Sequence, residues 1–244
     1  MSKNSLKLKI AYLYSDILQS FCDDFNVETF CKRAKWRDID VQVTYINAND
    51  RITSSKYDFY YIGGSNLDKI DNARKALSRN EDILKVAAVS CVPMLAINCG
   101  YLLFGNFYQL PNATPSNGLK ILDVDSMPSK KPNFGSVSGV CKFLKNKTIV
   151  GYKNHIMTSY LKTDSTPFVF LDSNLKNDAA SKTEGARFNN VIGTYITSPI
   201  LAQNPHLCDF YIANSLRIKY KSKIPLTSLC DDIEWYSHKH MLEN

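Results

Sequence analysis

Apolar runs alternate with helix-compatible segments along the first hundred residues of the chain. The apolar, β-forming runs are residues 8–14, 41–46, 58–62 and 92–97. The segments with helical spacing or helix-compatible composition are residues 27–36, 68–90 and 101–107. A run such as 58–62, which is apolar at nearly every position, is typical of a strand buried on both faces. This order predicts an α/β protein with a mostly parallel central sheet flanked by helices.

The second half of the chain is rich in strand candidates and poor in helices. The candidate strands are residues 119–124, 137–144, 148–152, 167–171 and 191–196. A helix is predicted from Asn204-Pro205, because asparagine can cap a helix and proline suits its first turn. Its expected buried stripe consists of Leu207, Phe210, Tyr211 and Ile218. We interpret residues 111–117 and the turn at 130–132 as surface connections, so residues 1–244 are predicted to form one domain with a peripheral tail from about residue 220.

Charge and cysteine content narrow the possible partners. The net charge of +7 is modest for 244 residues, and the one dense basic patch, residues 217–223, is interpreted as the solvated end of a helix. We therefore predict no nucleic-acid partner. The polar residues 1–5 lead directly into a strand-like run, so we expect no signal peptide, and no apolar run reaches the roughly 20 residues that span a bilayer, so no membrane insertion is expected. Seven irregularly spaced cysteines without a CxxC pair indicate reduced thiols in the cytoplasm, and we expect no metal or other cofactor.

Candidate chemistry lies where two predicted strands end. In parallel α/β sheets, backbone amides and helix N-termini converge at the carboxyl ends of strands. Gly63-Gly64 follows one strand and offers backbone N–H groups for an anion or oxyanion. Asn98-Cys99-Gly100 follows the next and has the form of a nucleophile elbow, a sharp strand-to-helix turn that projects one side chain. Taken alone, glycines after a strand are ordinary turn residues and a cysteine there is more often buried than reactive.

Several short segments occur along the chain in an order that is typical of one protein family. They are residues 14–16, 33–41, 59–64, 118–123, 151–155, 184–185 and 190–195. From about residue 8 to about residue 215 the chain resembles the cobyric-acid-synthase-like (CobB/CobQ) class I glutamine amidotransferases, most closely the GatD-like branch. The resemblance implies a flavodoxin-like fold. It also implies a subunit that hydrolyses glutamine and supplies ammonia to a Mur-ligase-like synthetase, which amidates the peptidoglycan precursor lipid II.

Both reacting positions of that family differ in this chain. The family uses an elbow cysteine as nucleophile and a histidine on a later strand end, and these positions fall on Asn98 and Thr197, while Cys99 takes the first glycine position of the elbow. A carboxamide cannot form the thioester intermediate, and a threonine hydroxyl does not titrate near neutral pH. The resemblance with these departures predicts a pseudoenzyme.

The predicted pseudoenzyme keeps a small polar pocket. It is shaped by Gly63, Gly64 and Gly100, has Asn98 and Thr197 at its floor, and can hold glutamine or another small amide without cleaving it. Cys99 and His155 are further candidates for its lining.

Two alternatives remain open at this stage. In the first, the elbow is shifted by one residue and Cys99 is the nucleophile of an active glutaminase, with His155 as the base. Of the other histidines, His206 falls at the start of the C-terminal helix, and His238 and His240 fall in a polar tail. A hydrogen-bonded structural role is the favoured interpretation of His155. In the second alternative, the chain is a non-catalytic regulatory protein unrelated to the cell wall.

Overall fold

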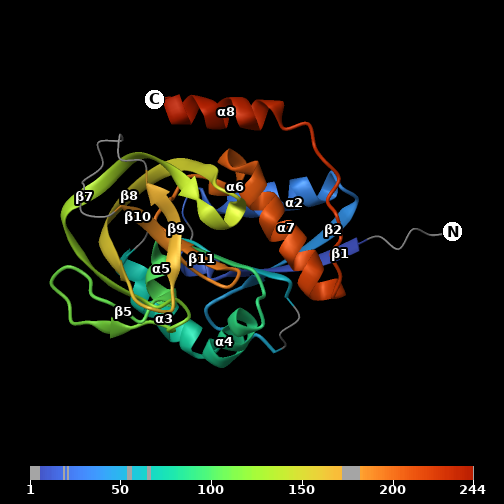
Figure 1. Cartoon of the computed structure of the whole chain (residues 1–244). Helices are drawn as coiled ribbons and strands as arrows, with labels where there is room; N and C mark the ends of the chain where they lie inside the picture. Colours follow the sequence, from blue (N-terminus) through green and yellow to red (C-terminus); the bar gives the residue numbers. More distant parts are fainter. Residues whose placement is uncertain are drawn as a thin grey trace.

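The fold is described from a computed structural model, which covers residues 6–243 apart from positions 19, 21, 54–56, 65–66 and 172–181. One sheet runs through the molecule (Figure 1). Its parallel part has the order β2 (Ile39–Ile46), β1 (Leu6–Leu13), β3 (Phe59–Ile62), β4 (Met94–Ile97) and β11 (Val191–Thr194). All residues of β3, β4 and β11 are buried, as expected of strands covered on both faces. The prediction of an α/β fold with a mostly parallel central sheet is confirmed.

Antiparallel strands extend the sheet beyond β11. They are β10 (Thr183–Phe188), β9 (Thr166–Leu171), β7 (Val124–Cys141) and β8 (Lys147–Leu161). At the far end, the short strand β5 (Phe107–Tyr108) pairs with β7 in parallel and with β6 (Ser116–Asn117) antiparallel. The long hairpin of β7 and β8 accounts for the strand-rich second half that the sequence predicts. Strand β10 was not predicted.

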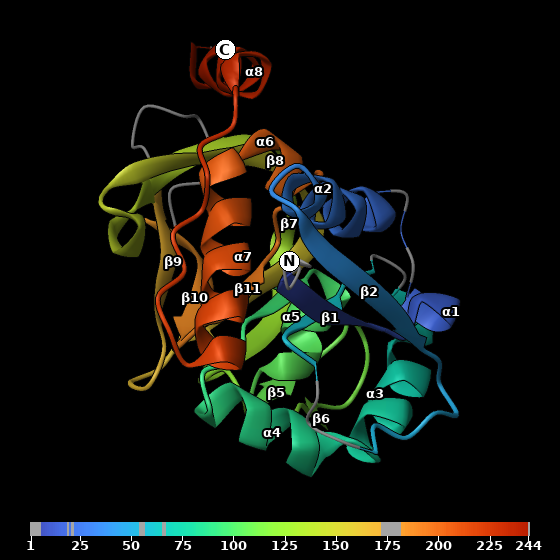
Figure 2. The ribbon, with the colours of Figure 1, turned by 90° about the vertical axis from the view of Figure 1, so that its right-hand side faces the viewer.

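Helices cover both faces of the sheet (Figure 2). They are α1 (Ser15–Leu18), α2 (Asp23–Lys35), α3 (Ile70–Ser78), α4 (Glu81–Val89), α5 (Cys99–Phe104), α6 (Ile200–Gln203), α7 (Pro205–Tyr220) and α8 (Asp232–Glu243), with 3-10 turns η1 (Leu67–Lys69) and η2 (Lys142–Leu144). One hydrophobic cluster joins the sheet to α3, α4 and α5, and a second joins it to α2, α6 and α7. In the part of the chain that the structure describes, no helix is long and apolar enough to cross a bilayer.

Two predictions for the second half are wrong. Residues 119–123 form no strand; they wrap around the end of α5, and the N–H groups of Leu119 and Ile121 donate to the carbonyls of Leu103 and Phe104. The predicted turn at residues 130–132 lies inside β7, where the pairing with β8 shifts between Pro128 and Asn133. A bulge absorbs the proline there, since proline cannot donate to a strand ladder.

Asn204 also differs from its predicted role. Within the described chain its side chain makes no capping hydrogen bond to α7. Instead it accepts from the Val150 N–H at 2.9 Å and donates to the carbonyls of Val150 and Ile200 at 2.8 Å. The buried amide therefore ties the start of α7 to strand β8.

The C-terminal tail is docked more closely than a polar tail predicts. Helix α8 lies on the outside of the molecule (Figures 1 and 2), yet His238 is only 2% exposed. Its ring contacts the Thr148 hydroxyl at 2.8 Å and the Gln203 carbonyl at 2.9 Å. Trp235 stacks on His206. These contacts bind α8 to β8, α6 and α7.

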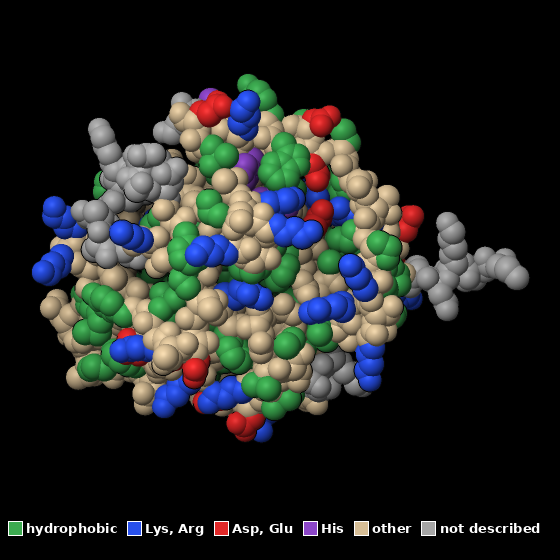
Figure 3. Space-filling model, in the orientation of Figure 1, with side chains coloured by type: hydrophobic (Ala, Val, Ile, Leu, Met, Phe, Trp, Pro, Cys, Tyr) green, Lys and Arg blue, Asp and Glu red, His purple; other side chains and the backbone are tan. Residues whose placement is uncertain are grey.

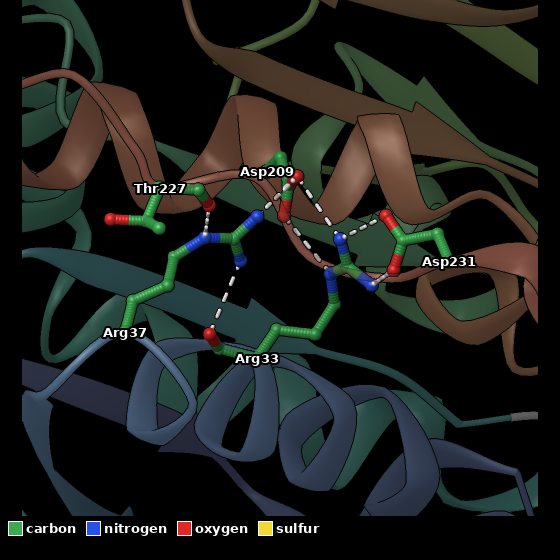
Figure 4. Close-up of polar contacts among 5 residues, drawn as sticks. All are labelled: Arg33, Arg37, Asp209, Thr227 and Asp231. Carbon is green, nitrogen blue, oxygen red and sulfur yellow. Dashed lines mark hydrogen bonds and ion pairs between the residues drawn. The ribbon is translucent and has the colours of Figure 1, made fainter.

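A buried cluster of charged residues joins helix α2 to the C-terminal half (Figure 4). Arg33, 2% exposed, makes paired hydrogen bonds to Asp209 at 2.9 and 3.0 Å and to Asp231 at 2.6 and 2.9 Å. Arg37 donates to Asp209 and to the Thr227 carbonyl, both at 2.7 Å. Burial lowers the pKa of Arg33, but the two carboxylates outweigh it and hold that pKa above its usual value. The guanidinium therefore fastens α7 and the start of α8 onto α2.

Replacement of Arg33 by alanine is expected to lower the free energy of unfolding by about 3 kcal/mol, because Asp209 and Asp231 lose their shared cation in a poorly hydrated site. Chemical denaturation measures the change. Lys32→Ala, at an exposed neighbouring position of the same helix, is the matched control. If both variants lose the same small amount, the cluster is not the anchor of the C-terminal half.

Candidate functional site

The turn from β4 into α5 has its corner at Asn98. The backbone there has φ 51° and ψ −105°, a region that non-glycine residues rarely occupy. The Asn98 N–H donates to the Thr194 carbonyl at 2.9 Å, and its carbonyl accepts from the Leu102 N–H at 3.1 Å. These two bonds fix the turn between β11 and α5. Among the described residues, the Asn98 side chain makes no hydrogen bond that caps the helix.

Cys99 is the first residue of α5 and is fully buried. Its N–H donates to the Gly64 carbonyl at 2.9 Å. Burial, with a smaller contribution from the charge of Asp23, raises the pKa of the Cys99 thiol to about 12. Because the thiolate is the nucleophilic form, the thiol is unreactive at neutral pH in this position.

The glycine pair after β3 contacts a buried carboxylate. The Gly64 N–H donates to Asp23 Oδ2 at 2.9 Å, and a Cβ on Gly63 would lie 2.0 Å from Asp23 Oδ1. Asp23 also accepts from the Tyr61 hydroxyl at 2.7 Å and from the N–H and hydroxyl of Ser20 at 2.7 and 2.8 Å. Burial raises the pKa of Asp23, although these hydrogen bonds oppose the shift. The N–H group expected to be free for an oxyanion is thus engaged by the chain's own side chain.

Glycines allow the two strand ends to approach each other closely. Gly64 has φ +99°, which favours glycine, and a Cβ there would lie 2.0 Å from the Leu18 carbonyl oxygen. A Cβ on Gly100 would lie 2.6 Å from the Ile62 carbonyl oxygen. The structure therefore brings Gly63, Gly64, Asn98, Cys99 and Gly100 together where β3 and β4 end.

Thr197 follows β11 and lies beside strand β8. Its N–H donates to the Tyr152 carbonyl at 2.9 Å, and its hydroxyl donates to the same oxygen at 3.4 Å. The Thr197 hydroxyl is thus bonded to a backbone carbonyl. Among the described residues, no hydrogen bond joins it to a charged side chain. The position carries no group that accepts a proton near neutral pH.

His155 lies on β8 and lines a cavity of about 60 Å³. Its ring stacks on Tyr195 with 4.0 Å between ring centroids, and its Nδ1 accepts from the Met157 N–H at 3.4 Å. Nε2 is buried without a hydrogen-bond partner in the described part of the chain. Burial, and then the charge of Lys153, lowers the pKa of His155 to about 4. One ring nitrogen thus fits the structural role favoured for this histidine, and the other is unpaired.

The cavity beside His155 is not the pocket that the sequence predicts. Its polar lining includes Tyr101, Lys153, Ser159, Glu184 and Tyr195. Of the residues proposed for the pocket, only His155 is among the described lining residues. Nor is any hydrogen bond formed between His155 and Cys99 in the described ranges. The base and the nucleophile proposed for a shifted elbow are therefore not paired.

Two buried carboxylates near these positions, Asp23 and Glu184, were not among the predicted site residues, although Glu184 lies in one of the family-like segments. Asp23 opens α2, where an acidic residue is ordinary, so no pattern marked it. Glu184 accepts from the Thr194 hydroxyl at 2.7 Å and from the Tyr195 N–H at 2.8 Å, which holds β10 against the end of β11. Within the residues that the structure describes, no group of three or more His, Cys, Asp or Glu side chains is placed to hold a metal ion.

Comparison with known proteins identifies the family and the fold. A model of the CobB/CobQ-like glutamine amidotransferase domain matches residues 9–205, most of the chain. The chain belongs to this family. As a CobB/CobQ-like protein it carries Asn98 at the strand-to-helix corner, where the resemblance places the nucleophile of the family's active members.

Curated relatives of this CobB/CobQ-like protein include GatD subunits of lipid II isoglutaminyl synthase (glutamine-hydrolyzing). The Staphylococcus aureus subunit is 32% identical over 213 residues, which are 87% of this chain and 86% of the relative. The Streptococcus pneumoniae subunit is 24% identical over 226 residues, covering 92% of this chain and 86% of the relative. The resemblance to GatD seen in the sequence is confirmed.

Solved structures agree on the fold. A glutamine amidotransferase from Thermotoga maritima superposes with a TM-score of 0.53 at 12% identity, over 98% of this chain and 94% of that one. The glutaminase domain of a Trypanosoma brucei CTPS, with bound acivicin, reaches a TM-score of 0.56 at 9% identity, over 91% and 97% of the two chains. At these identities the likeness supports the architecture alone.

Asn98→Gly is expected to raise the free energy of unfolding by about 1 kcal/mol, because glycine adopts the corner conformation without strain. Cys99→Gly is expected to lower it by about 1 kcal/mol, because it puts glycine into α5 and removes a buried thiol. Denaturant titrations of both variants measure the two changes in the free energy of unfolding. The opposite pattern, with a gain at Cys99 and a loss at Asn98, would mean that the corner has shifted by one residue.

The depressed pKa of His155 predicts a loss of stability in acid. The unfolded imidazole has a pKa near 6.5 and the folded one about 4, so between these values the unfolded state binds the extra proton. The full contribution of His155 to the free energy of unfolding is therefore present above pH 6.5. It decreases by about 2–3 kcal/mol as the pH falls toward 4. His155→Asn keeps an acceptor for the Met157 N–H and should reduce the difference in unfolding free energy between pH 7 and pH 4.5. An unchanged difference would show that His155 is protonated in the folded state.

Proposed function

We propose that this chain is a GatD-like subunit of a lipid II-amidating synthase that has lost glutamine hydrolysis. In this proposal it works in the cytoplasm by binding a Mur-ligase-like synthetase. The names of the curated relatives support the assignment to lipid II amidation. The corner residue supports the loss of hydrolysis, because the resemblance assigns the family's nucleophile position to Asn98, and Asn98 occupies the strand-to-helix corner. That single position carries the proposal.

The loss of chemistry follows from the groups present. Thioester formation needs a sulfur at the corner, and a side-chain amide offers no comparable nucleophile. The departing ammonia needs a proton donor, and Thr197 replaces the imidazole that would shuttle that proton. Cys99 is the neighbouring sulfur, but it is buried with a pKa of about 12. What remains is a polar corner that can hold glutamine or another small amide without breaking its C–N bond.

The competing function is an active glutaminase that uses Cys99. It requires the backbone corner to move by one residue and the thiol to gain a base. His155, the candidate base, is stacked on Tyr195 and accepts from Met157 instead. A regulatory role outside the cell wall is the other competitor. Co-purification of the chain with a Mur-ligase-like protein from its own organism would favour the proposed role, and a different partner would favour regulation.

Ammonia release from glutamine tests the loss of hydrolysis. The wild-type chain, with and without the ligase subunit, is expected to release ammonia at least about 1,000-fold more slowly than the Staphylococcus aureus GatD subunit assayed in the same way, because loss of a nucleophile costs several orders of magnitude. Cys99→Ala is expected to leave the residual rate unchanged.

Two results would refute this part of the proposal. One is turnover that disappears in Cys99→Ala. The other is mass-spectrometric detection of acivicin bound covalently to Cys99. Turnover that survives the substitution would point to contaminating enzyme.

A further inference from the structure

A groove of about 860 Å³ lies between helix α7, residues 221–231 and the start of α8. Its apolar lining includes Phe143, Leu144, Phe210, Ile224, Leu226 and Trp235. Trp235 is 38% exposed, and Lys147 lies over its ring at 5.5 Å. Figure 3 shows this face of the molecule, where basic side chains lie among hydrophobic ones. The groove is therefore both hydrophobic and positively charged.

The positive charge of the groove is not neutralised by its own acidic residues. Lys145, Lys147, Arg217 and Lys223 line it and are exposed, and within the described residues no salt bridge involves any of them. The two carboxylates that line it, Asp209 and Asp231, are engaged by Arg33 and Arg37 (Figure 4). Four cations are thus left to attract an acidic ligand.

The wall of the groove is held in place before any ligand arrives. Residues 221–231 have no regular secondary structure, but Arg37 binds the Thr227 carbonyl at 2.7 Å and Arg33 binds Asp231. A preformed wall reduces the ordering cost of association. Most of the lining also follows residue 205, where the match to the family domain ends. The groove is thus built mainly by the C-terminal part of this chain.

We infer that this groove binds an acidic segment of the ligase subunit that carries one or more bulky apolar side chains. The inference rests on the proposed function for the identity of the partner. Carboxylates of the segment would face the four cations that form no salt bridge among the described residues, and its apolar side chains would fill the recess beside Trp235. A membrane surface fits less well, because a flat lipid surface cannot enter a recess and would contact protruding residues instead.

Charge reversal tests the inference on the full chain. Arg217→Glu/Lys223→Glu reverses two of the four cations, and Lys69→Glu/Lys75→Glu makes the same change in net charge on the 3-10 turn η1 and helix α3. Binding to the co-expressed Mur-ligase-like subunit of the same organism is measured by titration calorimetry at low and high salt. The groove variant is expected to bind at least tenfold more weakly, and the control variant within threefold of wild type. Wild-type affinity should also fall more steeply with salt than that of the groove variant.

Each outcome bears on a different claim. Wild-type binding that is unchanged in the groove variant would overturn the groove and leave the proposed function intact. No binding of the wild-type chain would overturn both. Sedimentation with phosphatidylglycerol vesicles that is lost only in the groove variant, together with unchanged binding to the ligase subunit, would make the groove a lipid contact and overturn the inference. Equal melting temperatures of both variants confirm that they fold.

Discussion

The close approach of two strand ends constrains the rest of the site. Strand β4 must leave the sheet and enter α5 within one residue, while Gly100 backs onto the Ile62 carbonyl of β3. Asn98 lies between the two elements and makes the turn with a positive φ. Asparagine is among the non-glycine residues that most often accept positive φ. A change from a nucleophile to asparagine can thus abolish reactivity and still preserve the corner.

The parts of the fold with local signals could be predicted from the sequence. Strands β3 and β4 are continuous apolar runs, and helix α7 begins at a proline that suits a first turn. Residues 119–123 look like a strand because three of the five are apolar, but most of their backbone N–H groups donate to carbonyls at the end of α5 instead of a neighbouring strand. The bulge inside β7 depends on pairing with β8, so its Lys-Lys-Pro sequence could only suggest a turn.

Some residues of the candidate site could likewise be predicted from the sequence, and others could not. Asn98, Cys99 and the glycine pair follow strands whose carboxyl ends must be neighbours, so the sequence could group them. Asp23 accepts a hydrogen bond from the N–H of Gly64, which lies 41 residues later in the chain, and nothing near Asp23 in the sequence reveals that contact. His155 could be recognised as a candidate, but its stacking on Tyr195 depends on how β8 lies against the residues that follow β11.

The ion cluster at Arg33 determines how much of the chain is needed for stable folding. Both of its acidic partners, Asp209 and Asp231, lie beyond residue 205, as do α8 and all of α7 except its first residue. A gene fragment cut where the shared family segment ends would leave a buried guanidinium without a counter-ion and would lack the helix that packs with α2 and α6 on one face of the sheet. The autonomous folding unit is accordingly longer than the inherited segment, and recombination at that boundary would yield no stable product.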